Sequence, residues 1–206
     1  MIIRHVILHF MILLMAMGGA AMASNEPRYR IETTQPSLAA SGAEIRVYDS
    51  VLIASVKVRG NSWRDASSMA FRPLANYIFG ENASNEKIGM TTPVTTHQVT
   101  IPETGERLWE VRFFMPERYS RQTLPSPQSP YVSLDEQKQM RFAVIKFSGH
   151  AQGEVGSENF ITHEAKLRYL LDKANIPSDG VAHYAVYNGP WTPAMMRRNE
   201  VLITLP

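Results

Sequence analysis

Two arginines and two phenylalanines within residues 61–94 have the chemistry to bind a flat ligand. On a helix with 100° per residue, Arg64, Phe71, Arg72 and Phe79 lie at or beside the edge of a broad apolar arc, on a face that should meet water. Aromatic rings can cover an apolar ligand, and guanidinium groups can bind its carboxylates through paired hydrogen bonds. The same spacing also suits solvated arginines, a Phe71 that borders the core and a Phe79 that packs at the helix end, so both interpretations stand.

Methionines and one helical histidine are further candidates for ligand contact. Met69 and Met90 lie near the same stretch and could line an apolar site, although methionine also commonly fills cores. His163 shares the apolar stripe of a second predicted helix with Phe160 and Leu167. Its position is consistent with a hydrogen-bonded core histidine or with a ligand-facing group.

The remaining histidines give no sign of a metal site. We expect His97 at a strand edge on the surface, and His150 and His183 exposed near loops. Among His97, His150, His163 and His183, no two have the spacing of a zinc pair. The sequence also has no nucleophile elbow, no metalloprotease motif and no glycine-rich phosphate loop. We therefore assign no catalytic residue and no metal ligand.

A capped helix and a series of short strands must position these residues. Ser62 followed by Asp65 is a capping signal, and Gly80 and Asn82 favour the end of that helix. A second helix is expected at 157–174, and the proline-rich residues 116–130 predict a linker or a surface loop. Alternating or β-rich patterns predict strands at 44–48, 51–59, 87–90, 94–101, 108–115, 140–148, 183–187 and 200–206.

The order of these elements suggests an internal duplication. The motif E-V-x-x-x-x-P ends both proposed halves, starting at Glu110 and at Glu200. Halves at about 43–116 and 131–206 would each contain a strand-strand-helix-strand-strand unit. The two units predict one α+β domain with a curved sheet or barrel that carries two helices.

The N-terminal residues 1–23 resemble a secretory signal peptide. Arg4 precedes an apolar run over 6–17, and Ala21-Met22-Ala23 is a small-x-small cleavage site. An uncleaved anchor is the alternative, but the run is short for a bilayer span of about 20 residues. We expect export to the periplasm or beyond, no stable membrane insertion after cleavage, and a flexible lead-in over 24–42.

Composition narrows the class of protein further. The 206 residues include no cysteine, so an exported chain must rely on its hydrophobic core rather than on disulfides. Without Arg4, which the signal would remove, 20 basic side chains face 19 acidic ones. This balance argues against a nucleic-acid-binding protein, which would show a strongly basic surface.

Several motifs, in order along residues 44–205, carry a resemblance to a known family. They are Glu44-Ile-Arg-Val-Tyr48, Trp63…Phe71-x-x-Leu74-x-x-Tyr77-Ile78-x-Gly80-x-Asn82, Lys87-Ile88-x-Met90-Thr91-x-Pro93-Val94, Tyr184-x-x-Tyr187-Asn188-x-Pro190 and Arg198-Asn199-Glu200-Val201. Together they resemble the SOUL haem-binding protein family. The resemblance implies a distorted antiparallel β-barrel made from two similar halves, with two long helices.

The resemblance also implies a ligand and a site. Members bind haem and other tetrapyrroles at a mainly apolar surface beside the first helix, where Phe71 matches a pocket-facing position. The candidate haem-binding residues are Arg64, Met69, Phe71, Arg72, Ile78 and Met90. Some members carry a possible axial histidine where this chain has Val47, so ligation through that position is excluded. His163 and His97 are then the candidate axial ligands, with Met69 or a tyrosine as alternatives.

The sequence therefore favours reversible binding of haem or a related tetrapyrrole, as in a carrier, buffer or scavenger. Weak, exchangeable binding suits such a role better than redox catalysis, which depends on defined axial ligands. Two alternatives remain: a binding module for another amphipathic ligand or a protein partner, and an enzyme acting on tetrapyrroles.

Overall fold

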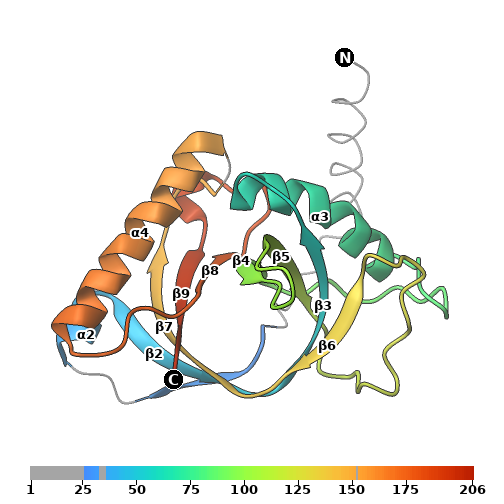
Figure 1. The fold of residues 1–206 in the computed structure, drawn as a ribbon, viewed down its shortest axis with the longest axis horizontal. Coiled ribbons are helices and arrows are strands. Elements are labelled where there is room, and N and C mark those ends of the chain that lie inside the picture. The colour runs from blue at the N-terminus through green and yellow to red at the C-terminus, as the bar shows by residue number, and fades with distance from the viewer. Residues whose placement is uncertain (1–25, 33–35, 152) are drawn as a thin grey trace.

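The computed structural model describes residues 26–32, 36–151 and 153–206. Within these ranges nine antiparallel strands form one curled sheet, an open half-barrel with β1 and β6 at its edges (Figure 1). The strands are β1 (Tyr29–Glu32), β2 (Ala43–Tyr48), β3 (Val51–Val58), β4 (Val94–Thr100), β5 (Arg107–Phe114), β6 (Ser133–Gln137), β7 (Met140–Phe147), β8 (Ala182–Val186) and β9 (Asn199–Leu205). The helices are α2 (Pro36–Ala40), α3 (Trp63–Ile78), α4 (Gly153–Lys173) and the short 3-10 helix η1 (Ala194–Met196). The predicted α+β class and the two long helices are confirmed.

The strand order is symmetric about the central pair β4–β8. From that pair the sheet continues as β5, β3 and β6 on one side, and as β9, β7 and β2 on the other, with β1 added beyond β2. The registers correspond as well, since Val51 of β3 lies opposite Gln137 of β6, and Met140 of β7 lies opposite Tyr48 of β2. Each half of the sheet therefore receives strands from the other half of the sequence: β6 joins β3, and β2, with β1 beyond it, joins β7.

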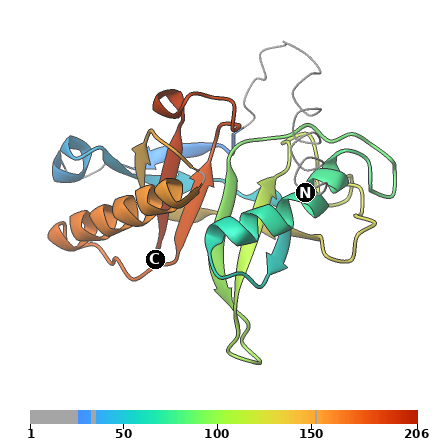
Figure 2. The ribbon, with the colours of Figure 1, turned by 90° about the horizontal axis from the view of Figure 1, so that it is seen from above.

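Each long helix covers one half of the sheet (Figure 2), with α3 packed on β3, β4 and β5 and α4 packed on β7 and β9. Both helices have apolar residues at intervals of three or four, which form a core-facing stripe. The buried residues of the α3 stripe are Trp63, Ala66, Ala70, Leu74, Ala75, Tyr77 and Ile78, and those of α4 are Gly156, Phe160, Leu167 and Leu171.

The two helices lie on the same face of the sheet. Thr96 of β4 hydrogen-bonds Ser67 of α3 at 2.9 Å, and its register partner Tyr184 packs 5.3 Å from the ring of Phe160 on α4. Directly paired residues of an antiparallel sheet point to the same face. The opposite face therefore carries the alternate residues of each strand, including His97 and His183.

Several elements differ from the sequence-based expectation. The lead-in prediction for 24–42 is wrong for its described part, because β1 pairs with β2 and Leu38 of α2 is 1% exposed. The polar composition of this segment had given no sign of a strand or a helix. The structure also adds β6, which lies within the polar stretch after the predicted loop, and starts α4 at Gly153 rather than at 157.

The strand predicted at 87–90 does not form. Asn82, which is fully buried, donates from Nδ2 to the carbonyl oxygens of Tyr77 and Glu86 at 3.0 and 2.8 Å. The N–H of Ile88 also donates to the carbonyl of Ile78 at 2.8 Å. The backbone of this segment is thus tied to the end of α3 instead of to a neighbouring strand.

Candidate functional site

Helix α3 presents a rigid outer face because both of its ends are fixed. Ser62 Oγ accepts a hydrogen bond from the N–H of Asp65 at 3.2 Å, which confirms the predicted cap. At the other end, the N–H of Phe79 donates to Ala75 at 2.9 Å, before the loop held by Asn82. The residues on the outer face therefore have defined positions relative to the sheet.

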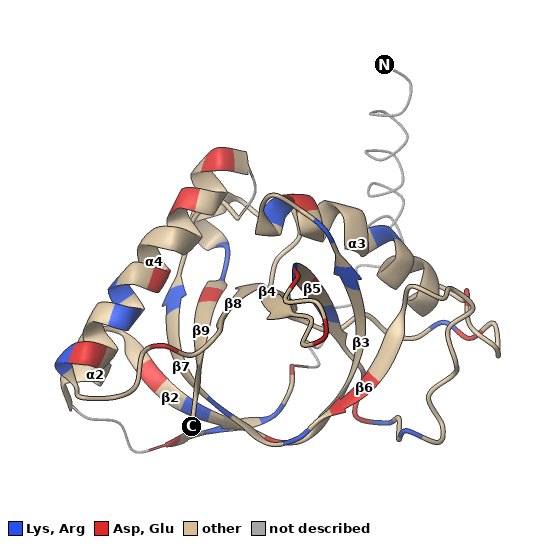
Figure 3. Cartoon of the chain, in the orientation of Figure 1, with Lys and Arg blue, Asp and Glu red and all other residues tan. Residues whose placement is uncertain are grey.

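Four side chains of this segment are accessible together, and we call them the α3 outer face: Arg64, Met69, Arg72 and Phe79. Met69 is 55% exposed and Phe79 is 40% exposed, which is unusual for large apolar residues on a packed helix. Among the described residues, neither Arg64 nor Arg72 has a carboxylate within ion-pair distance. Figure 3 shows basic positions at separate points along α3. This face offers apolar surface and free positive charge together.

The other predicted site residues on this side of the molecule belong partly or wholly to the core. Ile78 is 1% exposed and packs with Leu74 against the sheet, so it cannot contact a ligand at the outer face. Met90 is half-buried against the same cluster. Phe71 is also half-buried, with its ring 5.6 Å from that of Phe113, so it borders both the core and the surface.

Arg64 differs from Arg72 in its surroundings. Arg64 lines a cavity of about 300 Å³ together with Ser62 and with Glu154 and Glu158 from the first turns of α4. These carboxylates share the cavity with the guanidinium, so an anionic ligand would meet repulsion there. Arg72 is absent from the lining of that cavity.

His97 and His183 are buried, and the prediction that they lie on the surface is wrong. They are register partners on β4 and β8, with rings stacked 4.2 Å apart at an interplanar angle of 22°. Only 4% of His97 and 6% of His183 are exposed, because Phe142 and other residues cover the face away from the helices. His97 therefore cannot ligate iron held at the α3 outer face.

Burial keeps His97 neutral, although a carboxylate lies beside it. Nε2 of His97 lies 3.3 Å from Glu110 Oε2, and Nδ1 has no hydrogen-bond partner within the described structure. Burial lowers the pKa of His97, and it lowers the pKa of His183 further, where charge on His97 and on Arg112 acts in the same direction. Burial would raise the pKa of Glu110, but hydrogen bonding to His97 and the charge of Arg112 outweigh this and lower it to about 2. The pair is thus neutral histidine with ionised glutamate at pH 7.

His163 packs as a core-facing histidine of α4. Its ring stacks on that of Phe147 at 3.9 Å, and Nδ1 lies 2.7 Å from the carbonyl oxygen of Asn159. A carbonyl can only accept, so Nδ1 carries the proton and Nε2 retains a lone pair. His163 keeps the chemistry of a ligand, but it lies on α4 and not on α3.

Sequence reasoning missed a buried ionic network on the face away from the helices. Glu200 is fully buried and accepts from Arg46 through both oxygens at 2.8 and 3.1 Å, from Tyr187 at 2.6 Å and from Arg198 at 3.0 Å. Burial would raise the pKa of Glu200, but these hydrogen bonds and charges lower it below its ordinary value. The repeated motif E-V-x-x-x-x-P was the signal in the sequence that could have pointed to Glu200. Its first copy begins at Glu110, which is also buried in a strand.

The described ranges contain no group of three histidine, aspartate or glutamate side chains that could hold a metal ion. In the same ranges, no helix combines the length and the apolar character that crossing a bilayer requires. The predicted signal peptide, residues 1–23, lies outside the described residues.

Comparison with known proteins assigns the chain to a family. The model of the family described as SOUL heme-binding protein matches residues 24–204. The chain belongs to the SOUL heme-binding protein family. This confirms the resemblance seen in the sequence, and the match extends over the described part of the fold.

Relatives agree with this assignment, and a solved structure shares the fold. Heme-binding protein 2 of Homo sapiens is 28% identical over 161 residues, which cover 77% of this chain and 75% of that protein. Heme-binding protein 1 of Xenopus tropicalis is 29% identical over 161 residues, which cover 77% and 80%. A crystal structure of an uncharacterized conserved protein from Listeria innocua shares the fold, with a TM-score of 0.56, 12% identity and coverage of 80% of this chain and 92% of that one.

Proposed function

We propose that this SOUL family member binds haem or a related tetrapyrrole reversibly, as a carrier, buffer or scavenger. The observation that carries the proposal is the family match over residues 24–204, together with relatives named heme-binding proteins. The family membership supports the class of ligand, and the location of the site must be argued from the residues of this chain.

The α3 outer face is the site that suits this ligand best. Met69 and Phe79 offer exposed apolar contact, and Phe71 adds a partly buried edge between them and the core. Arg64 and Arg72 have no ion pair among the described residues, and the charge of Arg72, which does not share the cavity of Glu154 and Glu158, is the more available to the carboxylates of a porphyrin. The bound group would contribute a flat apolar surface and an iron centre, and the chain would hold it by packing and charge. Among the candidate ligands, only Met69 lies on this face.

Titration with ferric haem, followed by its Soret absorbance, tests the proposal. Replacement of Arg72 by Gln should weaken binding about tenfold, since a hydrogen bond to a charged group contributes about 1.5–3 kcal/mol. Arg64→Gln should weaken it less, because Glu154 and Glu158 share its cavity. Arg107→Gln, an exposed arginine on β5, is the matched control. Failure of the unmodified protein to bind haem saturably would refute the function, and equal affinity in Arg72→Gln would refute the site.

The protein is proposed to act after export. The family match starts at residue 24, directly after the predicted cleavage site at Ala21-Met22-Ala23. Fractionation of producing cells, followed by the intact mass of the protein, tests this. A mass that begins at Ser24 in the exported fraction is expected, and a full-length chain in the cytosol would contradict export.

The two halves are proposed to derive from one duplicated unit. Support comes from the symmetric strand order, from matching registers and from two glutamates that begin the same motif and are both buried. The ligand surface is proposed for one copy of the unit only, since Met69, Arg72 and Phe79 belong to the first.

A further inference from the structure

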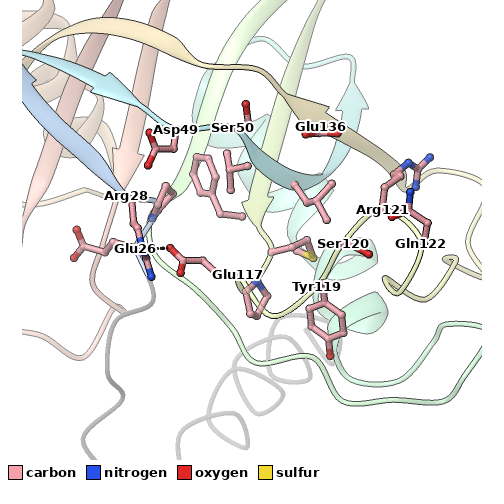
Figure 4. A pocket seen from close by; sticks show the side chains of 16 residues that line it. Glu26, Arg28, Asp49, Ser50, Glu117, Tyr119, Ser120, Arg121, Gln122 and Glu136 are labelled. Carbon is pink, nitrogen blue, oxygen red and sulfur yellow. Dashed lines mark ion pairs between the residues drawn. The ribbon is translucent and has the colours of Figure 1, made fainter.

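A second cavity in the described part of the chain lies away from the α3 outer face. It has a volume of about 440 Å³, within the range of small-molecule sites. Four segments far apart in sequence line it: residues 26–28, the β2–β3 turn with the start of β3, the end of β5 with the loop that follows it (114–122), and Glu136 of β6. Figure 4 shows these side chains around the cavity.

The floor of this cavity is apolar. Val51, Leu52 and Phe114 are half-buried there, and Met115 is 3% exposed. The floor is rigid, because the N–H of Met115 donates to the carbonyl of Leu52 at 2.8 Å. An organic group of modest size can therefore replace water on a preformed apolar surface.

Some charged groups of the rim are already committed to ion pairs. Arg28 pairs with Glu117 at 2.7 Å, and Glu26 pairs with Arg198 at 2.9 Å. These pairs hold residues 26–28 and the 116–122 loop in place as walls. They leave little net charge of their own for a ligand.

Three charged residues of the rim have no ion pair within the described structure: Asp49, Glu136 and Arg121. Figure 4 shows Asp49 and Arg121 on opposite sides of the apolar side chains, with Glu136 nearer to Arg121. All three are exposed, so their ionised forms are solvated and available. Two free carboxylates against one guanidinium give the cavity a net preference for positive charge, centred on the side of Asp49.

We propose that this cavity binds a small organic cation, an ammonium group on an apolar body, with the ammonium at Asp49 and the apolar body on Val51, Leu52 and Phe114, while Glu136 adds negative charge at the far side of the cavity. Haem does not fit this chemistry, because its carboxylates would face Asp49 and Glu136. The cation site is thus separate from the proposed haem surface, and the two proposals can be tested independently.

Calorimetric titration with 2-phenylethylamine tests the proposal, with 3-phenylpropionate as a probe of similar shape and opposite charge. Saturable binding of one amine per chain is expected, with much weaker binding of the carboxylate. The double variant Asp49→Asn, Glu136→Gln should lose about tenfold in affinity or more, by the size of a charge-assisted contact. Because neither carboxylate has an ion pair, this variant should fold normally.

Two further variants test whether charge changes the affinity for the amine in the expected direction. Arg121→Gln should leave amine affinity unchanged or increase it, because a repelling charge is removed. Glu103→Gln, in the exposed β4–β5 turn, should change nothing. Prior saturation with haem should leave amine binding intact. The proposal is overturned if no saturable heat appears up to about 10 mM amine, if the carboxylate binds as well as the amine, or if the double variant binds like the unmodified protein.

Discussion

The rings of His97 and His183 stack 4.2 Å apart across β4 and β8, the central strand pair that joins the two halves of the sheet. Both are buried, and Glu110, Arg112 and Lys57 are the charged groups that influence them. Protonation of both rings would place two positive charges in contact at this junction. We therefore expect the stability of this junction between the halves, the β4–β8 seam, to depend on pH.

Acidification should destabilise the protein through these histidines. Their folded-state pKa values lie below the ordinary 6.5, so below pH 6.5 the unfolded chain binds protons that the folded chain does not. The free energy of unfolding should then fall with decreasing pH, approaching about 1.4 kcal/mol per pH unit for each histidine. Urea denaturation between pH 8 and pH 5 measures this slope.

His183→Phe should flatten that pH dependence, because it removes one titrating group from the seam. His150→Asn, at an exposed site, should leave it unchanged. Glu110 does not affect the slope in this pH range. Because its pKa is lowered to about 2, its contribution to the free energy of unfolding changes only below about pH 4.5. An unchanged slope in folded His183→Phe would contradict the assignment.

Replacement of Glu200 by Leu should destabilise the fold strongly. The change leaves Arg46 buried, with 4% of its side chain exposed, and without its main counter-charge. Breaking a buried ion pair in this way costs about 3–5 kcal/mol. The double variant Arg46→Met, Glu200→Leu should cost less than Glu200→Leu alone.

Chemical denaturation of these variants gives the comparison. Glu106→Gln, which breaks an exposed pair with Arg59, should have little effect and serves as the control. If Glu200→Leu and Glu106→Gln prove equally mild, the buried network does not stabilise the fold as described.

Gly180→Ala should also be poorly tolerated. A Cβ atom at this position would overlap the carbonyl oxygen of Thr204 on β9, and backbone on both sides would have to shift. Such overpacking costs about 1–3 kcal/mol. Gly89→Ala is the matched control, since no atom lies within 4 Å of its Cβ position. Melting temperatures of the two variants should differ clearly, and similar values would argue against close approach at Gly180.

Met69→Leu should separate packing from ligation in the haem complex. Leucine conserves the volume and apolar contact, so affinity should change by less than about tenfold. If the Met69 sulfur contacts the iron, the absorption bands of bound haem should shift in this variant. Met90→Leu, half-buried against the core, should show no spectral change. Identical spectra for all three proteins would exclude Met69 as an axial ligand.

Local patterns in the sequence predicted helices and strands better than they predicted which side chains interact. Ser62 and Asp65 identified the start of α3, and alternation identified most strands, because capping and pleating are properties of neighbouring residues. The partnership of Arg46 with Glu200 spans 154 positions and depends on β2 joining the second half of the sheet. No local pattern contains that information.

The candidate site shows the same limit. The exposed arginines of α3 were found by helical spacing. Ile78 was a ligand candidate through the family resemblance, although it lies within the apolar arc of the helix and packs in the core. His97 was expected at the surface because alternation tells which residues share a face, and not whether that face is covered. The cavity lined by Asp49 and Glu136 joins four segments that are far apart in sequence, so only the fold brings its residues together.

The exchange of β2 and β6 between the halves has a consequence for the integrity of the chain. A cut within the loop at 117–130 would leave the β1–β2 pair on one fragment and β6 on the other, each away from the half of the sheet that it completes. Alone, each half of the sheet would have open strand edges, at β3 and β4 in one fragment and at β7 and β8 in the other. Mixed together, they would restore each other's hydrogen bonding, so the protein should reassemble from its pieces by fragment complementation.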